Sequence, residues 1–377
     1  MATDPNRPRA DDATLRVALC QCNLPVGDLA GNLDRLRDLI ACASERGADL
    51  TVFPELSATG YPPEDLLLNP RFTEAAADGV RRLAASVTGT VAVVGLPDLA
   101  GDLHNAAAVL AGGEVAAVYR KHFLPNYAVF DEQRYFARGD AALTVDLGGT
   151  RVGVTICEDL WYPGGPGRWA AIDGGAVVLV NLSGSPYHRG KGVERERMLA
   201  QRAADYGCFV AFCNAVGGQD ELVFDGHSLV IDPAGRVVAR GAQFEEDLLV
   251  VDLDILSATR RRLHDPRWRQ AGADRERVRS VTVETATPSS HAAEPALGEP
   301  RLRTVETAAP PTPPVGPAVG AGPSRTVETA PPSPSSGTPL GKRRLRTAEA
   351  AAMTRPPSTR GEPLGKRRLP VAETGGP

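Results

Sequence analysis

The chain has 377 residues, a formal net charge of −4 at neutral pH and 42% hydrophobic residues. This composition supports one large or two modest globular domains, and the slight negative charge excludes a general electrostatic attraction for nucleic acid. No apolar run approaches the ~20 residues that a membrane helix needs, and the polar start MATDPNRPRADD lacks a secretory signal, so we expect a cytoplasmic protein without a nucleic-acid or membrane partner.

Residues 15–253 alternate between predicted strands and helices. Many of the strands lack polar alternation, which indicates that both of their faces are covered, and two helix-covered sheets packed together fit this pattern. Gly148-Gly149 predicts a hairpin turn. The strands are expected at 15–21, 49–55, 91–97, 106–110, 114–121, 143–147, 151–158, 177–181, 208–214, within 227–240 and at 247–254, and the helices at 28–46, 71–86 and 191–206.

The six cysteines predict free thiols. Four of them lie in apolar runs typical of strands, which favours buried thiols over disulfides and fits a reducing compartment. No two pairs have the spacing of metal ligands, so no metal site is expected. The six are Cys20, Cys22, Cys42, Cys157, Cys208 and Cys213.

The composition changes sharply near residue 274. The segment 274–377 holds more than half of the 32 prolines and no aromatic residue, so it cannot bury enough apolar surface to offset its chain entropy. It also repeats itself, with TVETATPS at 282–289 returning as TVETAAPP and TVETAPPS, and PLGKRRLRTAE at 339–349 returning once. We predict a disordered, Pro-rich, low-complexity tail over 265–377 and a flexible N-terminus over 1–13.

Three apolar strands end in a reactive side chain: Glu55, Lys121 and Cys157. Strand ends in layered α/β proteins bring distant segments together. A thiolate can attack an amide, a carboxylate can take the thiol proton and deliver it to leaving ammonia, and an ammonium can stabilise the oxyanion. The backbone N–H of Glu158 is a natural second oxyanion donor. Taken singly, these residues also fit a buried thiol, a helix cap and a solvated charge.

The surrounding strings carry a resemblance over roughly residues 15–255. The blocks ELSATGYPPEDLLL, RKHFLPNYAVFDEQRYF, ICEDLW, NLSGSPYHRGK and GGQDELVFDGHS resemble the glutaminase domain of glutamine-dependent NAD synthetases, a branch of the nitrilase or carbon–nitrogen hydrolase superfamily. The resemblance implies an α/β fold, the four-layer α-β-β-α sandwich of the nitrilase type, for a nitrilase-like glutaminase domain over 14–264. It also implies glutamine as substrate and a homo-oligomer.

The resemblance also implies roles for single residues. Glu55 matches the general base, Lys121 the catalytic lysine, and Cys157 the nucleophile that forms a thioester. Three further positions match substrate contacts, and an acid matches one that orients the lysine in related hydrolases. A pocket for free glutamine needs polar partners for its carboxylate and its ammonium. The substrate contacts are Tyr127, Ser185 and Lys191, and the supporting acid is Glu132.

The chain departs from the resembled family in one respect. Its relatives carry a second domain that makes NAD with a pyrophosphate-binding SGGxDS loop, and no such string occurs here. We therefore expect no cofactor and no ATP binding, and NAD synthesis would need a separate synthetase subunit as partner. Two alternatives remain open: a stand-alone amidase or nitrilase for another small amide, and a non-catalytic interaction module that acts through the PPTPP and KRR segments of its tail.

Overall fold

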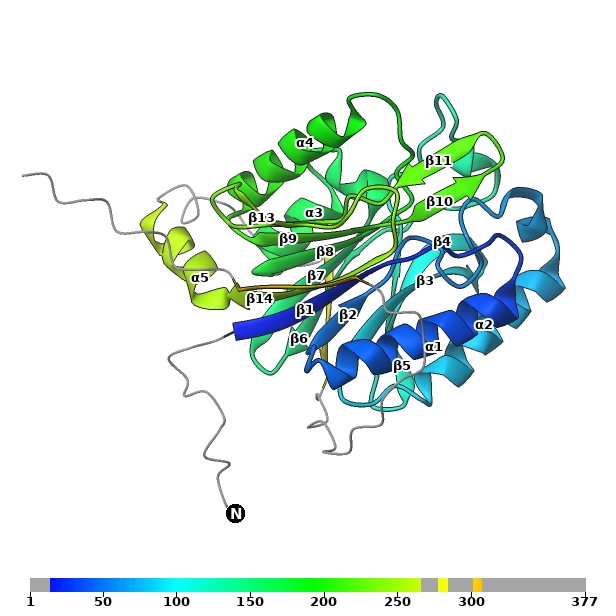
Figure 1. Ribbon diagram of the computed structural model, residues 1–377, viewed down its shortest axis with the longest axis horizontal. Coiled ribbons are helices and arrows are strands. Elements are labelled where there is room, and N and C mark those ends of the chain that lie inside the picture. The colour runs from blue at the N-terminus through cyan, green and yellow to red at the C-terminus, as the bar shows by residue number, and fades with distance from the viewer. Residues whose placement is uncertain (1–13, 266–276, 284–300, 307–377) are drawn as a thin grey trace, which may run out of the picture. The chain divides into compact units, whose positions relative to one another are not determined.

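Two seven-stranded sheets carry most of the strands of the structure (Figure 1). The computed structural model describes residues 14–265, 277–283 and 301–306, which belong to one compact unit. In spatial order, the first sheet is β16 (Arg301–Glu306), β14 (Asp247–Asp254), β1 (Thr14–Gln21), β2 (Leu50–Val52), β3 (Val91–Ala100), β4 (Asp102–Ala111) and β5 (Glu114–Arg120). The second is β13 (Val237–Arg240), β12 (Leu229–Ile231), β9 (Phe209–Asn214), β8 (Val178–Ser183), β7 (Thr150–Ile156), β6 (Ala142–Leu147) and β15 (Val278–Val283).

Helices cover the outer face of each sheet. The first sheet carries α1 (Leu29–Glu45) and α2 (Pro70–Ala84), and the second carries α3 (Pro166–Arg168) and α4 (Lys191–Tyr206) (Figure 1). The carboxylate of Asp28 caps α1 by accepting the backbone N–H of Gly31 at 3.0 Å. The remaining elements are α5 (Ile255–His264), the hairpin β10 (Val216–Gln219) and β11 (Leu222–Asp225), and the short turns η1 (Glu64–Leu68), η2 (Glu132–Arg134), η3 (Cys157–Leu160) and η4 (Trp169–Asp173).

Alternation along the strands builds three hydrophobic cores. On β1, Val17 and Leu19 lie between the two sheets, whereas Ala18 and Cys20 pack against α1 and α2. The same alternation on β9 divides its side chains between the inter-sheet core and a core beneath α4. Because side chains point alternately to opposite faces, continuous apolar strands of this kind require cover on both sides. The predicted α-β-β-α sandwich is confirmed, as is the two-residue turn at Gly148-Gly149, which joins β6 to β7.

The strand directions bring the chemistry to one end of the sandwich. Strands β1, β2 and β3 are parallel, and because β4 is antiparallel to both β3 and β5, β5 runs in the same direction as β2. In the second sheet β7, β8 and β9 are parallel. The segments that follow β2, β5, β7 and β8 can therefore converge, as strand carboxyl ends do in α/β folds.

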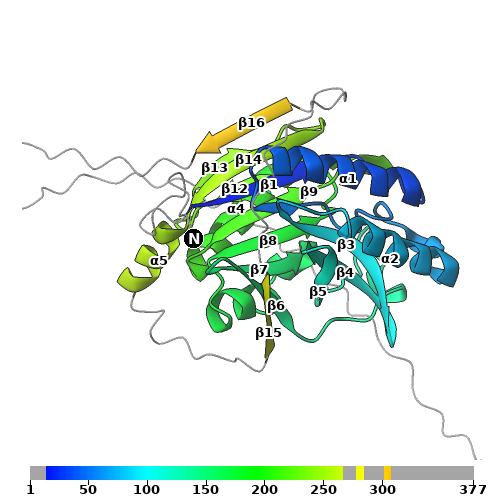
Figure 2. The same cartoon turned by 90° about the horizontal axis from the view of Figure 1, so that it is seen from below.

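The region 265–377, predicted as a disordered tail, contributes two strands. β15 pairs in parallel with β6, and β16 pairs in parallel with β14, so each extends a sheet at its edge (Figure 2). The tail prediction weighed proline content over the whole segment, whereas VRSVTV is locally rich in β-branched residues, which favour a strand. An open sheet edge offers unpaired backbone groups to such a segment. Residues 1–13, 266–276, 284–300 and 307–377 lie outside the described residues.

Candidate active site

Glu55 lies just beyond the end of β2 and is only 1% exposed. Its Oε1 accepts hydrogen bonds from Nζ of Lys121 at 2.6 Å and from Nδ2 of Asn105 at 2.8 Å, and its Oε2 accepts the backbone N–H of Gly184 at 3.0 Å. Gly95 lets the loop lie close to β3, since a Cβ there would come within 2.3 Å of the backbone nitrogen of Leu56. Three donors therefore fix the orientation of the Glu55 carboxylate.

Lys121 is fully buried between two carboxylates. It follows β5 directly, and its Nζ donates to Oε1 of Glu55 and, at 2.8 Å, to Oε1 of Glu132. Burial alone would lower the pKa of Lys121, but the facing carboxylates of Glu132 and Glu55 raise that pKa well above its usual value. The lysine is therefore a permanent cation that links the two acids.

Glu132 completes the group as a second buried acid. Its Oε1 also accepts the hydroxyl of Tyr61 at 3.0 Å. Burial raises the pKa of Glu132 to about 7, against the opposing effect of Lys121. The nearby charge of Glu55 adds to the rise in the pKa of Glu132. Glu132 thus contacts Lys121, and its role in orienting that lysine stays a prediction.

Cys157 stands at a sharp turn after β7, where the strand passes into η3. Its φ is +38°, a backbone conformation that costs a non-glycine residue on the order of 1–3 kcal/mol and that concentrates at functional sites. Strand-to-helix turns of this kind present a nucleophile clear of its sheet. The backbone N–H of Glu158 belongs to the first turn of η3, where helical N–H groups have no acceptor within the helix, which suits the predicted oxyanion donor.

Asp159 holds this turn to the segment that carries Lys121. Its Oδ2 accepts the backbone N–H of Ile156 at 3.0 Å and the hydroxyl of Tyr119 at 2.6 Å. Its Oδ1 accepts the backbone N–H groups of His122 and Phe123 at 3.1 and 3.0 Å. One buried carboxylate thus fixes the backbone beside the thiol relative to the backbone beside the lysine.

The thiol of Cys157 is close enough to Glu55 and Lys121 for their charges to act on it. Burial raises the pKa of Cys157 and Glu55 raises it further, whereas Lys121 lowers it. The net effect is a pKa above the usual value for a thiol, so the resting group is protonated and needs a base before it can attack. Glu55, whose charge acts on the thiol, stays the predicted acceptor of that proton.

Cys157 opens onto a cavity of about 270 Å³. The predicted substrate residues Tyr127, Ser185 and Lys191 all line it, together with Glu158. The hydroxyl of Tyr127 donates to the Glu158 carboxylate at 2.9 Å, and Nζ of Lys191 lies 3.9 Å from the ring centroid of Trp161. The cavity therefore presents the carboxylates of Glu158 and Glu221 and the ammonium of Lys191 to a ligand whose reacting carbon lies at the thiol. We call it the thiol pocket.

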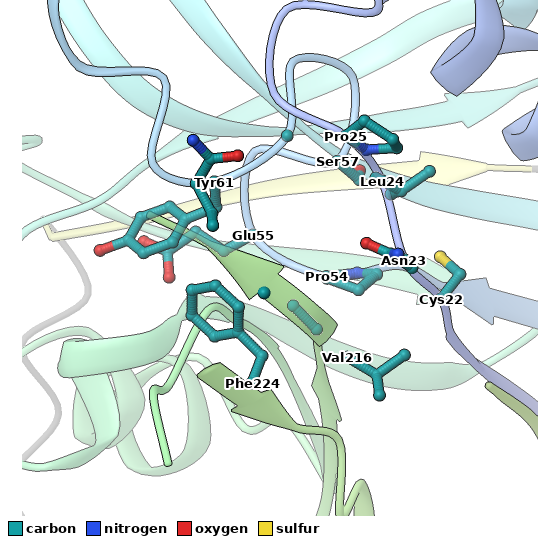
Figure 3. Close-up of a pocket in the computed structure, with 14 residues that line it drawn as sticks. Cys22, Asn23, Leu24, Pro25, Pro54, Glu55, Ser57, Tyr61, Val216 and Phe224 are labelled. Atoms are coloured by element: carbon teal, nitrogen blue, oxygen red, sulfur yellow. The ribbon is translucent and has the colours of Figure 1, made fainter. Parts of the chain in front are cut away.

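A second, much smaller cavity of about 30 Å³ is bordered by Glu55. Tyr61 and Phe224 also border it (Figure 3), with ring centroids 6.0 Å apart. The absence of a side chain at Gly184 admits the Tyr61 ring, which a Cβ would approach to 2.6 Å. Such a volume holds about one water-sized molecule.

The structure brings all the predicted site residues to one place: Glu55, Lys121, Glu132 and Cys157 form a buried cluster, and Tyr127, Ser185, Lys191 and Glu158 line the thiol pocket. Sequence reasoning missed Asn105, Asp159 and Gly184, which orient this cluster. Each is one polar or small residue in a mostly apolar context, and only the tertiary contacts show its role. The signal available for Asp159 was its place in the ICEDLW block.

The described residues hold no group of three or more histidine, cysteine or acidic side chains arranged for a metal ion. The six cysteines are free, as predicted. Within the same part of the chain, no helix is long and apolar enough to cross a membrane.

The four-layer sandwich and the buried Glu–Lys–Cys cluster at its strand ends define the class as a nitrilase-type α/β protein. Residues 16–262 match the family model described as carbon-nitrogen hydrolase. The chain belongs to the carbon–nitrogen hydrolase family, so the resemblance seen in its sequence is confirmed.

Curated relatives and solved structures agree. The glutamine-dependent NAD(+) synthetase of Aquifex aeolicus is 49% identical over 275 residues, which are 71% of this chain and 48% of the relative. That of Thermotoga maritima is 44% identical over 285 residues, 75% of this chain and 50% of the relative. The chain thus spans about half the length of these relatives.

Two solved structures cover the same region. Glutamine-dependent NAD+ synthetase from Acinetobacter baumannii in complex with ADP aligns at a TM-score of 0.63 with 34% identity, covering 65% of this chain and 47% of that one. A glutamate mutant of the amidase from Nesterenkonia sp. AN1, with the acetamide moiety of fluoroacetamide added covalently at its active-site cysteine, aligns at 0.59 with 30% identity. This second alignment covers 67% of this chain and 94% of the amidase.

The raised pKa of Cys157 predicts how its alkylation depends on pH. Since only the thiolate reacts, the rate constant with iodoacetamide will rise about tenfold per pH unit without a plateau up to about pH 9.5. Mass spectrometry of the peptide that contains Cys157 measures the rate, and free N-acetylcysteine, which levels off near its own pKa, is the reference. A plateau between about pH 7 and 8 would instead indicate a resting thiolate.

Proposed function

We propose that this chain hydrolyses the side-chain amide of glutamine to glutamate and ammonia, with Cys157 as nucleophile. The observation that carries the proposal is the buried Glu55–Lys121 contact beside Cys157, which itself opens onto a pocket lined by acidic and basic side chains. The names of the relatives, glutamine-dependent NAD(+) synthetases, support glutamine as the substrate.

The geometry supports the following reaction. Glu55 accepts the thiol proton as the sulfur of Cys157 attacks the amide carbon, and the oxyanion that forms is stabilised by Lys121 and the backbone N–H of Glu158. Glu55 returns the proton to the nitrogen, the C–N bond breaks, ammonia leaves and a thioester remains. Water, deprotonated by Glu55, hydrolyses the thioester, which releases glutamate and restores the thiol. The cysteine adduct in the Nesterenkonia amidase supports this role for the thiol.

The charges of the thiol pocket suit a free amino acid. The carboxylate of Glu158, which accepts the Tyr127 hydroxyl, can bind an α-ammonium. The ammonium of Lys191, now 3.4 Å from the Glu194 carboxylate, and the hydroxyl of Ser185 can bind an α-carboxylate. Burial raises the pKa of Glu158, and its hydrogen bond from Tyr127 opposes that rise. A ligand ammonium would favour the ionised form of Glu158 in the same way, because an opposite charge stabilises a buried carboxylate.

A second candidate is hydrolysis of another small amide. The alignment that covers 94% of the Nesterenkonia amidase favours it, since that whole protein, named an amidase, is about the size of the domain described here. The thiol chemistry would be the same, and only the pocket residues distinguish the two substrates. The interaction-module alternative concerns tail segments that lie outside the described residues and stays a prediction.

The proposed activity predicts ammonia release from glutamine by the purified chain. Cys157→Ala will abolish release, and Glu55→Gln will lower kcat about 10²- to 10⁴-fold, the usual contribution of a general base. A coupled glutamate dehydrogenase assay measures ammonia, and intact-mass spectrometry detects the glutamyl thioester. Cys42→Ala removes a half-buried thiol on α1 that lies outside the site and will leave the rate unchanged. Full activity in Cys157→Ala would refute the proposal.

The charges of the thiol pocket predict that one substitution will affect the kinetics of a charged substrate more than those of an uncharged one. Lys191→Met will raise KM for glutamine about tenfold or more, as loss of a charge-assisted contact does, and will leave kcat/KM for propionamide within about twofold. Arg189→Met, which removes a neighbouring exposed cation, is the matched control. Equal effects on both substrates would favour the small-amide candidate.

We further propose that the chain assembles as a homo-oligomer and supplies ammonia to a separate NAD synthetase subunit. The relatives that match over about half their length support the second point. Glutamine should then support NAD formation by an ammonia-dependent synthetase only when this chain is present with Cys157 intact, and light scattering should give a mass above that of one chain. A monomer, or no NAD formed from glutamine, would contradict the respective point.

A further inference from the structure

A buried ion pair lies behind the thiol pocket. Arg195, on α4, and Asp225, at the end of β11, are both fully buried, with Nη2 3.1 Å from Oδ1 and Nη1 3.4 Å from Oδ2. Among the described residues Nε of Arg195 has no hydrogen-bond partner. A buried pair that is incompletely satisfied is weak evidence for stability, because well-packed apolar side chains often stabilise as well or better. Its presence calls for another explanation.

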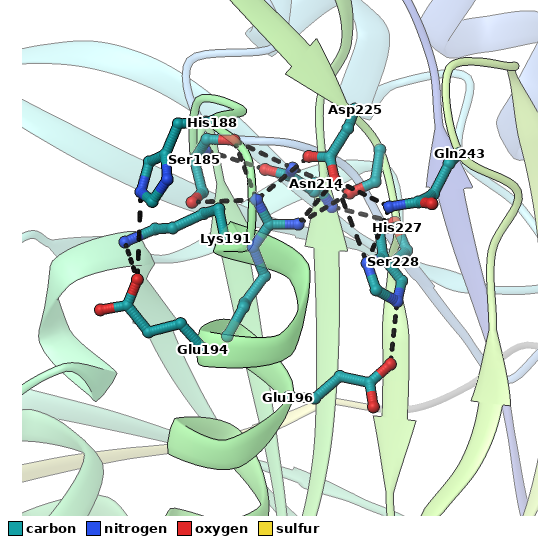
Figure 4. Close-up of polar contacts among 12 residues, drawn as sticks. Ser185, His188, Lys191, Glu194, Glu196, Asn214, Asp225, His227, Ser228 and Gln243 are labelled. Atoms are coloured by element: carbon teal, nitrogen blue, oxygen red, sulfur yellow. Dashed lines mark hydrogen bonds and ion pairs between the residues drawn. The ribbon is translucent and has the colours of Figure 1, made fainter.

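Arg195 contacts the pocket residue Ser185 directly. Nη2 donates to the backbone oxygen of Ser185 at 3.4 Å and to its hydroxyl at 3.3 Å. Asn214 holds the same residue from β9, since its Oδ1 accepts the Ser185 N–H at 2.9 Å and its Nδ2 donates to the Ser185 oxygen at 3.2 Å. Figure 4 shows Ser185, Asn214 and Asp225 linked in one network. The polar atoms of Ser185 are therefore fixed from two elements.

The segment held in this way also contacts the proposed base. Gly184, adjacent to Ser185, donates its backbone N–H to Oε2 of Glu55. Tyr187, two residues later, donates its N–H to the oxygen of Val223 at 2.7 Å, on the same strand that carries Asp225. A shift of Ser185 would therefore change the orientation of the Glu55 carboxylate as well as the floor of the pocket.

Arg195 also anchors the helix that carries the pocket ammonium. Lys191 and Arg195 are four residues apart on α4, so they lie on one face of the helix. The contact of Arg195 with Asp225 therefore fixes the position and rotation of α4, and with them the place of Lys191 in the thiol pocket. The other side of the pair is packed as well, because Nε2 of Gln243 lies 3.3 Å from Oδ2 of Asp225.

We propose that the Arg195–Asp225 ion pair is a positioning device for the site proposed above, which sets Ser185 and Lys191 for the substrate and, through Gly184, aims Glu55 at Cys157. The pair touches neither the substrate nor the thiol, so both residues are positioning residues. The inference rests on the proposed hydrolysis and assigns to the pair a role in catalysis in place of one in stability.

The decisive variant is the double substitution Arg195→Met with Asp225→Leu, which removes both charges and keeps apolar volume, so that the fold is retained. We expect an unfolding midpoint in urea close to that of the wild type. We also expect kcat/KM for glutamine to fall about 100-fold, the effect of misplacing reacting groups by about 1 Å. KM should rise because Ser185 and Lys191 no longer hold the substrate in place, and kcat should fall because Glu55 is misaligned. A pair with a purely structural role would change neither KM nor kcat in a variant that folds normally.

Arg262→Met is the matched control. Arg262 is a largely buried arginine that donates to the backbone oxygens of Gly207 and Gly175, which precede β9 and β8, at the opposite end of these strands from the site. Its substitution will lower the urea midpoint and leave kcat and KM unchanged. Arg195→Lys, which keeps the charge but loses the planar fork, should recover part of the activity lost in Arg195→Met.

A folded double variant with kcat and KM within twofold of the wild type would overturn the inference. Should the double variant not fold, Asp225→Asn decides, since it keeps the size and one acceptor oxygen: a loss of about tenfold in kcat/KM supports the positioning role, and no loss overturns it. A wild-type chain inactive on glutamine and on small amides would refute the proposed function itself. An active wild type with an equally active variant would refute only the positioning role.

Discussion

The ammonium of Lys121, buried between Glu55 and Glu132, is the interaction on which the rest of the site depends. An isolated buried charge is too costly to keep, and removal of one member of a buried pair typically costs about 3–5 kcal/mol. The three residues come from segments after β2 and β5 and from η2. Each buried charge therefore meets its partner only when the sandwich is correctly folded. Burial, with two acids sharing one cation, raises the pKa of Glu132 to about 7.

The sequence predicted much of this arrangement because local signals agree with the global fold. Continuous apolar strands require cover on both faces, and that requirement alone favours a layered sandwich. Glu55, Lys121 and Cys157 were found because each follows such a strand within a long, specific string. The pairing of strands, and therefore the distance between these three residues, depends on contacts between remote segments and does not appear in any local pattern.

Other features were invisible for physical reasons. Arg195 lies in the string KGVERERMLAQR, whose charges are typical of an exposed helix face, and only the packing of α4 against β9 and β12 shows that this arginine is buried. Asn105 is one amide at the start of an alanine-rich strand, yet it donates to Glu55. β15 was concealed by the proline content of its neighbours, because composition averaged over a long window hides a six-residue strand.

The pairing of β1 with β14 has a consequence for how the protein is made. β1 lies between β14 and β2 in its sheet, and its Arg16 forms an ion pair with Asp252, 236 positions further along the chain. While the ribosome is still translating the intervening residues, β1 has one open edge and its apolar faces are only partly covered. Folding of the sandwich must therefore wait until β14 has emerged, and contacts of such long range form slowly. The nascent chain should consequently be a substrate for chaperones that shield exposed strands during synthesis.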